Sequence, residues 1–180
     1  MTASARRTNA TRLTFALTRS LVLTLLVLLG SATAFALEAG DRAPDFAAPA
    51  LDGKGTVSLA QYRGKVVYLD FWASWCAPCL KAIPEIEAMR KQLPAEKFQV
   101  VAVNLDTQTK KALRFLEKNP IGYPSASDPK GHLPKQFGVD TMPTSYLIDA
   151  DGVIRLVHRG FQRGDGAKLR AEIQKMLGGR

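Results

Sequence analysis

Hydrophobic and polar positions divide the chain into a short series of strands and helices. An almost unbroken apolar run at residues 66–72 is typical of a strand buried on both faces, and residues 98–104 repeat this character. Between the two runs, apolar positions at helical spacing predict a helix over residues 77–93, with Pro84 inside it. Two parallel strands joined by a helix form a right-handed βαβ unit, which we expect at the centre of the fold.

The rest of the pattern predicts a hairpin before this unit and further helices and strands after it. Alternating positions around a turn at residues 52–55 indicate an N-terminal hairpin. The later elements are, in order, an amphipathic helix at 107–119, an ambiguous segment at 121–127, a short helix at 132–137, hairpin strands at 144–148 and 153–158, and a helix at 165–177. Together they predict one α/β domain.

Residues 1–36 differ in character from this domain. They contain four arginines and no acid, an apolar run at 21–29, and an A-x-A cleavage site at 34–36. This combination predicts a secretory signal peptide that leaves a mature domain of residues 37–180. The less favoured alternative is an uncleaved membrane anchor, because the uncharged stretch at 20–37 is close to the minimum length for a span. Either interpretation places the domain in the periplasm or its equivalent.

Net charge changes this picture little. The chain has 25 basic and 16 acidic residues, a formal net charge of +9. Without the four arginines of the predicted signal, 21 basic and 16 acidic residues remain, which is +5. These charges are spread along the chain without a lysine and arginine cluster, so a solvated surface is favoured over a nucleic-acid interface.

Cys76 and Cys79 are the only two cysteines, and they stand where the first buried strand meets the following helix. A structural disulfide is the alternative to consider in an exported domain. A two-residue spacer, however, closes so small a loop that it removes little entropy from the unfolded chain, which favours a redox pair. The N-terminus of a helix stabilises a thiolate, so we predict Cys76 as the nucleophile and Cys79 as the resolving thiol.

Several motifs accompany these cysteines at the positions that thioredoxins would require. They are residues 71–79, Pro84 and residues 141–144, together with the segments at 43–46, 59–67 and 147–154. With the predicted signal, the chain resembles the exported TlpA/ResA-like thioredoxins over residues 40–178. The resemblance implies a thioredoxin fold, in which a central mixed sheet is flanked by helices. It also implies an N-terminal β-hairpin extension and an insertion between the βαβ unit and the C-terminal ββα unit.

The resemblance also assigns a client-binding surface. It implies a cis peptide bond before Pro143, with this proline facing the sulfurs, whereas the residues alone allow a trans turn proline equally well. It implies that Met142 offers its backbone to an extended client segment. Trp75 is expected at the rim of the active site, and Ala77 and Pro78 complete the surface.

Asp70 matches the buried carboxylate with which thioredoxins take a proton from the resolving cysteine. Ala102 stands where a lysine often accompanies that acid, so Asp70 is expected to be buried without a cationic partner. Burial would raise its pKa and suit it to proton transfer. The alternative is a hydrogen-bonded structural role. His132 and His158 are both interpreted as solvated or hydrogen-bonded residues.

The direction of electron flow follows from what the motif lacks. The dipeptide Ala77-Pro78 contains no histidine, the strongest stabiliser of an oxidising thiolate, and Ala82 replaces a glutamate found in some ResA-like proteins. We therefore expect a reductant of disulfide-bearing periplasmic clients, monomeric, supplied with electrons by a membrane thiol donor of the DsbD/CcdA class. We expect no cofactor beyond the Cys76–Cys79 disulfide, and a role in cytochrome c maturation stays open. The alternatives are a Cu(I)-binding metallochaperone and, less favoured, a thiol peroxidase.

Overall fold

A five-stranded mixed sheet forms the centre of the computed structural model, which describes residues 36–178. Its strands are β3 (Val66–Trp72), β4 (Phe98–Asn104), β5 (Ser125–Ser127), β6 (Thr144–Ile148) and β7 (Ile154–Arg159). Their spatial order is β5-β4-β3-β6-β7. Strands β3, β4 and β5 are parallel, β6 is antiparallel to β3, and β7 is antiparallel to β6.

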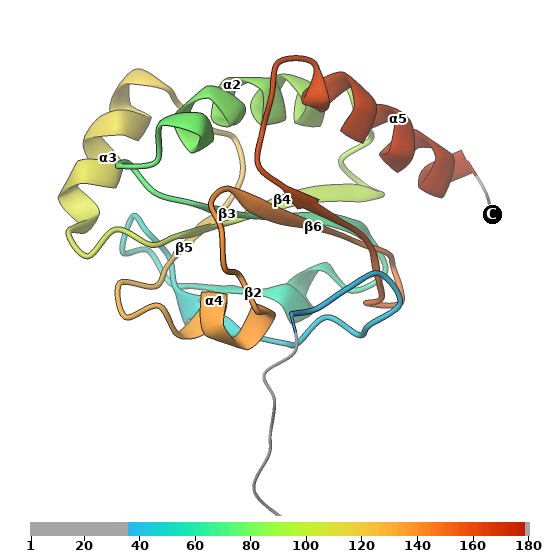
Figure 1. Cartoon of the computed structure of the whole chain (residues 1–180), viewed down its shortest axis with the longest axis horizontal. Helices are drawn as coiled ribbons and strands as arrows, with labels where there is room; N and C mark the ends of the chain where they lie inside the picture. Colours follow the sequence, from blue (N-terminus) through green and yellow to red (C-terminus); the bar gives the residue numbers. More distant parts are fainter. Residues whose placement is uncertain (1–35, 179–180) are drawn as a thin grey trace, which may run out of the picture. The chain divides into compact units, whose positions relative to one another are not determined.

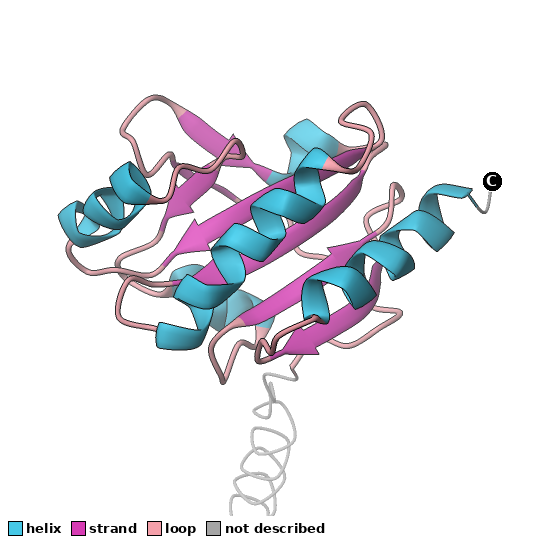
Figure 2. Ribbon diagram, turned by 90° about the horizontal axis from the view of Figure 1, so that it is seen from above, coloured by secondary structure: helices cyan, strands magenta, loops and turns pink. Residues whose placement is uncertain are grey.

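Helices cover both faces of this sheet (Figure 1). The helices on one face are α2 (Ala77–Lys91), α3 (Thr109–Lys118) and α5 (Asp165–Gly178). The opposite face is covered by α4 (His132–Phe137), the 3₁₀ helix η1 (Leu59–Tyr62) and the hairpin of β1 (Ala47–Pro49) and β2 (Thr56–Ser58). Figure 2 looks onto the first face, where α2 and α5 lie across the strands. Each layer contributes its own set of buried apolar side chains.

Strand β3 is buried along its whole length, and its side chains alternate between the two layers. Tyr68 and Trp72 belong to the core beneath α2 and α5, whereas Leu69 and Phe71 belong to the core on the opposite face. Asp70 has the same parity as Tyr68 and Trp72. The alternation therefore places a carboxyl group beneath the helix that begins at the cysteines.

The segment of residues 40–51 bonds to part of each edge strand of the sheet. At the β7 edge, the Gly40 amide donates to the Ile154 carbonyl at 2.8 Å. At the β5 edge, the Leu51 amide donates to the Ser125 carbonyl, also at 2.8 Å. An exposed edge offers unpaired backbone groups to other chains, and this segment occupies such groups at both ends of the sheet.

The predicted fold class is confirmed, including the N-terminal hairpin and the material inserted before the C-terminal hairpin. The predicted strands at 66–72, 98–104 and 144–148 have the observed bounds, as does the short helix at 132–137. The elements at 77–93, 107–119, 153–158 and 165–177 differ from α2, α3, β7 and α5 by one or two residues at an end. The ambiguous segment contains β5, a strand of three residues that is too short to show a period.

The predicted signal peptide, apart from Ala36, lies outside the described residues, so it stays a prediction together with the alternative of an anchor. Within residues 36–178, none of the helices combines the length and the apolar character that crossing a bilayer requires.

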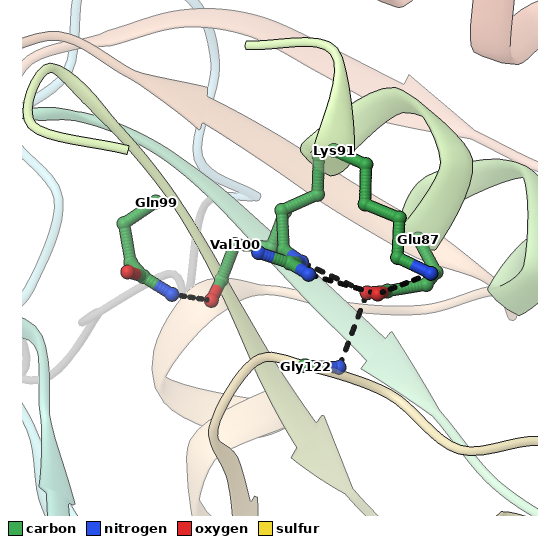
Figure 3. Close-up of polar contacts among 6 residues, drawn as sticks. Glu87, Lys91, Gln99, Val100 and Gly122 are labelled. Carbon is green, nitrogen blue, oxygen red and sulfur yellow. Dashed lines mark hydrogen bonds and ion pairs between the residues drawn. The ribbon is translucent and has the colours of Figure 1, made fainter. Parts of the chain in front are cut away.

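Glu87 ties α2 to the loop that precedes β5 (Figure 3). The Arg90 guanidinium donates two hydrogen bonds of 2.8 Å to its carboxylate, and the Gly122 amide donates a third at 3.2 Å. Lys91 Nζ lies 3.4 Å from the same carboxylate. Hydrogen bonding from Arg90 is the largest cause that lowers the pKa of Glu87, from 4.5 to about 2. The ionised form of Glu87 is therefore stabilised by the fold.

We expect Glu87→Gln to lower the free energy of unfolding at neutral pH by about 2 kcal/mol, because the neutral amide loses charge-assisted bonds. Since the native pKa lies below the unfolded value, this stabilisation is complete above about pH 5 and is lost as the pH falls towards 2. Urea unfolding across this range should therefore show the wild-type advantage shrinking. Glu96→Gln, at an exposed loop position, is the matched control and should show no such trend. A pH-independent difference for Glu87→Gln would contradict the prediction.

Candidate active site

The two cysteines form a disulfide at the N-terminus of α2, with their Cα atoms 5.2 Å apart. Cys76 is the N-cap of the helix, and its Sγ accepts a hydrogen bond from the Cys79 amide at 3.3 Å. Pro78 has no N–H group, so the Cys79 amide is the donor that the first turn directs at the sulfur. This geometry favours negative charge on Cys76 over Cys79 when the pair is reduced.

The two sulfurs also differ in access. Cys76 is 5% exposed, whereas Cys79 is 1% exposed and belongs to the core beneath α2. An incoming disulfide can therefore reach Cys76 more directly than Cys79. Cys76 therefore stays the predicted first nucleophile.

The loop before Cys76 is fixed by Asp106, which the sequence analysis missed. The Ser74 amide and hydroxyl donate to the Asp106 carboxylate at 2.8 and 2.6 Å, and the Asn104 side-chain amide donates at 2.8 Å. Asp106 is 2% exposed. It follows β4, whose carboxyl end lies beside that of β3 because the two strands are parallel. That adjacency was the available signal, and Asp106 holds the chain that presents Cys76.

The predicted client-binding residues differ in how the structure places them. Trp75 is 65% exposed and is the exposed large hydrophobic side chain of the described region. Ala77 and Pro78 are exposed beside it in the first turn of α2, whereas Pro143 is buried and Met142 is half-buried against both core layers. The Met142–Pro143 peptide bond is cis, as predicted.

The cis proline is held by the end of the neighbouring strand, β7. Its carbonyl accepts a hydrogen bond of 2.8 Å from the Gly160 amide, which follows β7. Gly160 has a φ of +80°, a conformation that favours glycine. The backbone around Pro143 is therefore fixed by a residue that is remote in the sequence.

Asp70 is buried beneath α2 without a cationic partner. It is 3% exposed, and its neighbours across the sheet are Ala102 on β4 and Ser145 on β6. No lysine or arginine of residues 36–178 lies within ion-pair distance of it. Desolvation raises the pKa of Asp70 from 3.8 to about 8. The expected burial and the absence of the lysine are thus both observed, and the carboxyl group can exchange a proton near neutral pH.

Two further features lie apart from the disulfide. A groove of about 720 Å³ is bordered by the N-terminal hairpin, α3 and the loop before β5, and its lining includes neither cysteine nor Pro143. Within the described part of the chain, no three His, Cys, Asp or Glu side chains are grouped so that they could hold a metal ion.

The sequence and the fold of the chain can be compared with those of known proteins. The sequence profile described as "AhpC/TSA family" matches residues 39–157. The chain belongs to the AhpC/TSA family. It is 33% identical to the thiol-disulfide oxidoreductase ResA of Bacillus thuringiensis subsp. konkukian over 141 residues, which is 78% of each protein. It is 36% identical to the thioredoxin-like protein YneN of Bacillus subtilis, over 69% of this chain and 73% of that protein.

A solved structure from Chlorobium tepidum, described as a candidate thiol:disulfide interchange protein DsbE, has the same fold. It superposes with a TM-score of 0.75 at 48% identity and covers 79% of this chain and all of that one. The resemblance to ResA-like thioredoxins, the thioredoxin fold and the class of thiol:disulfide oxidoreductases are thereby confirmed.

Asp70→Asn should stabilise the oxidised protein in a pH-dependent way. Because the native pKa of Asp70 is about 8 and its unfolded value is 3.8, the wild type loses stability as the pH rises between these values. The variant, which has no such ionisation, should gain up to about 5 kcal/mol on the wild type above about pH 8 and little at about pH 4. Denaturant titrations at both pH values measure this, and Asp151→Asn at an exposed position is the control. An equal effect at both pH values would argue against a raised pKa.

Proposed function

We propose that this chain is an exported thiol:disulfide oxidoreductase that reduces disulfides of client proteins in the periplasm. The observation that supports it best is the Cys76–Cys79 disulfide at the start of α2, with the Cys79 amide donating to Cys76 Sγ. This donor and the helix N-terminus together stabilise a Cys76 thiolate. A stabilised thiolate at the more exposed sulfur is what nucleophilic attack on a client requires.

The reaction proceeds by two thiol–disulfide exchanges. In the first, the Cys76 thiolate attacks a client disulfide, forms a mixed disulfide and releases one client thiolate. In the second, the Cys79 thiolate attacks Cys76 Sγ, closes the internal disulfide and releases the second client thiolate. Two electrons pass to the client, and the enzyme is left in the oxidised state that the structure contains.

Asp70 acts as the base for the second exchange. It accepts the proton of the Cys79 thiol, because a carboxyl group with a pKa of about 8 is matched to a thiol more closely than an ordinary aspartate. Its burial beneath α2, in the layer that also contains Cys79, supports this role. Without a lysine beside it, burial alone sets its proton affinity.

The client binds across the cysteines as an extended segment. The exposed face of Trp75 offers an apolar contact, and Ala77 and Pro78 leave the approach to Cys76 free of bulky side chains. Met142 offers its backbone just before the start of β6, where the cis bond to Pro143 fixes it, and an extended segment can add there as a strand.

A reductant in an oxidising compartment needs a supply of electrons, and a membrane thiol donor of the DsbD/CcdA class would provide it. The exchanges need no cofactor and no metal besides the disulfide itself. We propose that the protein acts as a monomer, because residues 40–51 occupy backbone groups at each edge of the sheet and so shorten the edges open to a second copy. No contact within residues 36–178 favours Cu(I) binding or peroxide reduction over this assignment.

Cys79→Ser should accumulate covalent complexes between Cys76 and clients, because the second exchange has lost its thiol. Non-reducing electrophoresis of the variant, expressed with its own N-terminal segment in a bacterial host, should show bands that reductant removes. Cys76→Ser makes the same substitution at the other cysteine and keeps only the Cys79 thiol. It is the matched control and should trap far fewer client complexes. Undiminished turnover by Cys79→Ser without any trapped complex would refute the mechanism.

The reduction potential tests the direction of electron flow. We expect a value below about −200 mV, nearer to thioredoxin than to the strong oxidant DsbA, because the motif contains no histidine to stabilise the thiolate further. Equilibration with a dithiothreitol series and alkylation of the free thiols measures it. A potential near about −120 mV would mean that the protein oxidises its clients instead.

A further inference from the structure

Three polar side chains form a row across the sheet, in the layer beneath α2 and α5. In the register, Asp70 on β3 stands opposite Ser145 on β6, and Ser145 stands opposite His158 on β7. Residues opposite each other on neighbouring strands have their Cβ atoms about 5 Å apart. The row therefore leads in two steps from the buried carboxyl group to the strand at the edge of the sheet.

Contacts confirm that the three side chains share one face. The Ser145 hydroxyl lies 2.7 Å from the Tyr68 hydroxyl, and Tyr68 belongs to the core beneath α2 and α5. His158 Nε2 lies 3.3 Å from Oδ2 of Asp165, the first residue of α5. Asp70 has the same parity on β3 as Tyr68. The row is polar only on the β7 side of Asp70, because Ala102 is the neighbour on β4.

His158 Nε2 faces the Asp165 carboxylate, which leaves the second ring nitrogen, Nδ1, to be accounted for. A neutral imidazole that donates from Nε2 to a carboxylate has a free acceptor at Nδ1. Nδ1 is buried and has no hydrogen-bond partner within the described residues. A buried polar atom of this kind calls for an explanation. Because the side chain as a whole is 22% exposed, His158 has a free acceptor on the inside and access to water on the outside.

Asp165 places an anionic side chain beside this histidine. The Gln162 amide donates to Asp165 at 2.8 Å and Lys168 Nζ donates at 3.0 Å. The bond from Gln162 is the largest cause that lowers the pKa of Asp165, so this carboxylate is ionised at neutral pH beside the imidazole. The row therefore ends at an imidazole that lies beside a carboxylate.

We propose that Ser145 and His158 conduct to solvent the proton that Asp70 receives from Cys79. The proposal rests on the proposed role of Asp70. The S–H bond of Cys79 breaks, an O–H bond forms on Asp70, and the sulfur's electron pair displaces the client thiolate from Cys76. In the oxidised structure Ser145 is hydrogen-bonded to Tyr68, and neither Asp70 nor His158 Nδ1 is bonded to it. Each transfer therefore follows a side-chain rotation that brings the pair within hydrogen-bond distance: the carboxyl proton passes to the Ser145 hydroxyl, which gives its own proton to His158 Nδ1, and the Nε2 proton leaves to water. No electrons move along the row, and His158 does not touch the reacting sulfurs; it acts through Asp70, from which it carries the proton away.

The charged and titratable groups around the row leave Asp70 and His158 as its proton carriers. The groups that face them are Tyr68 from β3, Tyr123 from the loop before β5, and Asp165 and Lys168 from α5. Burial raises the pKa of both tyrosines, so neither changes charge near neutral pH. Asp70, whose pKa burial raises to about 8, can exchange a proton in this range, and His158 has a ring nitrogen that can accept one.

The test compares two variants of His158 in the full chain, using reduction of a model disulfide peptide between about pH 5.5 and 9. His158→Gln keeps a donor for Asp165 but cannot accept and release a proton, so a purely structural role predicts the wild-type rate and pH profile. The relay predicts a rate about tenfold lower and an altered profile. His158→Ala should be equally slow, and added imidazole should restore it. His132→Ala, the other histidine and exposed at the start of α4, should behave as the wild type.

The outcomes separate this inference from the proposed function. If the wild type reduces the peptide and Asp70→Asn is slow, but both His158 variants keep the wild-type rate and profile, the relay is refuted while the function stands. A slow His158→Ala that imidazole does not restore would also refute it. If the wild type does not reduce the peptide, the proposed function fails, and the relay fails with it. Thermal unfolding of each variant shows that the rates refer to folded protein.

Discussion

Burial of β3 on both faces is the constraint on which the rest of the structure depends. Every residue of the strand is covered, so the chain must supply an apolar layer above it, from α2 and α5, and another below it. The same strand carries Asp70 in its interior and ends where Cys76 caps the next helix. The reactive sulfurs and the buried carboxyl group are thus positioned by one element, and their geometry relative to one another is as rigid as the centre of the sheet.

Sequence reasoning succeeded where a pattern is local and failed where it is not. The runs at β3 and β4, the cysteines at the helix start and the burial of Asp70 follow from residues close together in the chain. Strand β5 was missed because three residues show no period. Asp106 was missed because its partner Ser74 lies 32 residues away, and the row from Asp70 to His158 depends on strand register, which a single sequence does not display. The cis bond followed only from family resemblance.

Two buried carboxyl groups near the cysteines are treated in opposite ways by the fold. Asp106 receives hydrogen bonds from Ser74 and Asn104, and the bonds hold the loop in place. Asp70 receives none from the described residues, and its burial is unopposed. Hydrogen bonds stabilise the charge of a buried carboxylate, so such a group can hold neighbouring chain in place. A buried carboxylate without them is destabilised in its charged form and therefore takes up a proton more readily. The fold thus separates the task of positioning from the task of proton exchange between two side chains of the same type.

Residues 40–51 come first in the described chain, yet the groups that they bond lie at 125 and 152–154. The hydrogen bonds from residues 40–51 to the two edge strands can therefore form only after β5 and the β6–β7 hairpin have been synthesised and have joined the sheet. Contacts between such distant residues form slowly, because the entropy cost of closing a long loop must be met before the contact contributes any favourable free energy. In a chain that is synthesised or exported from its N-terminus, the backbone groups of both edge strands would stay unpaired for most of the folding time. Aggregation is consequently a greater hazard for the nascent domain than for the finished one.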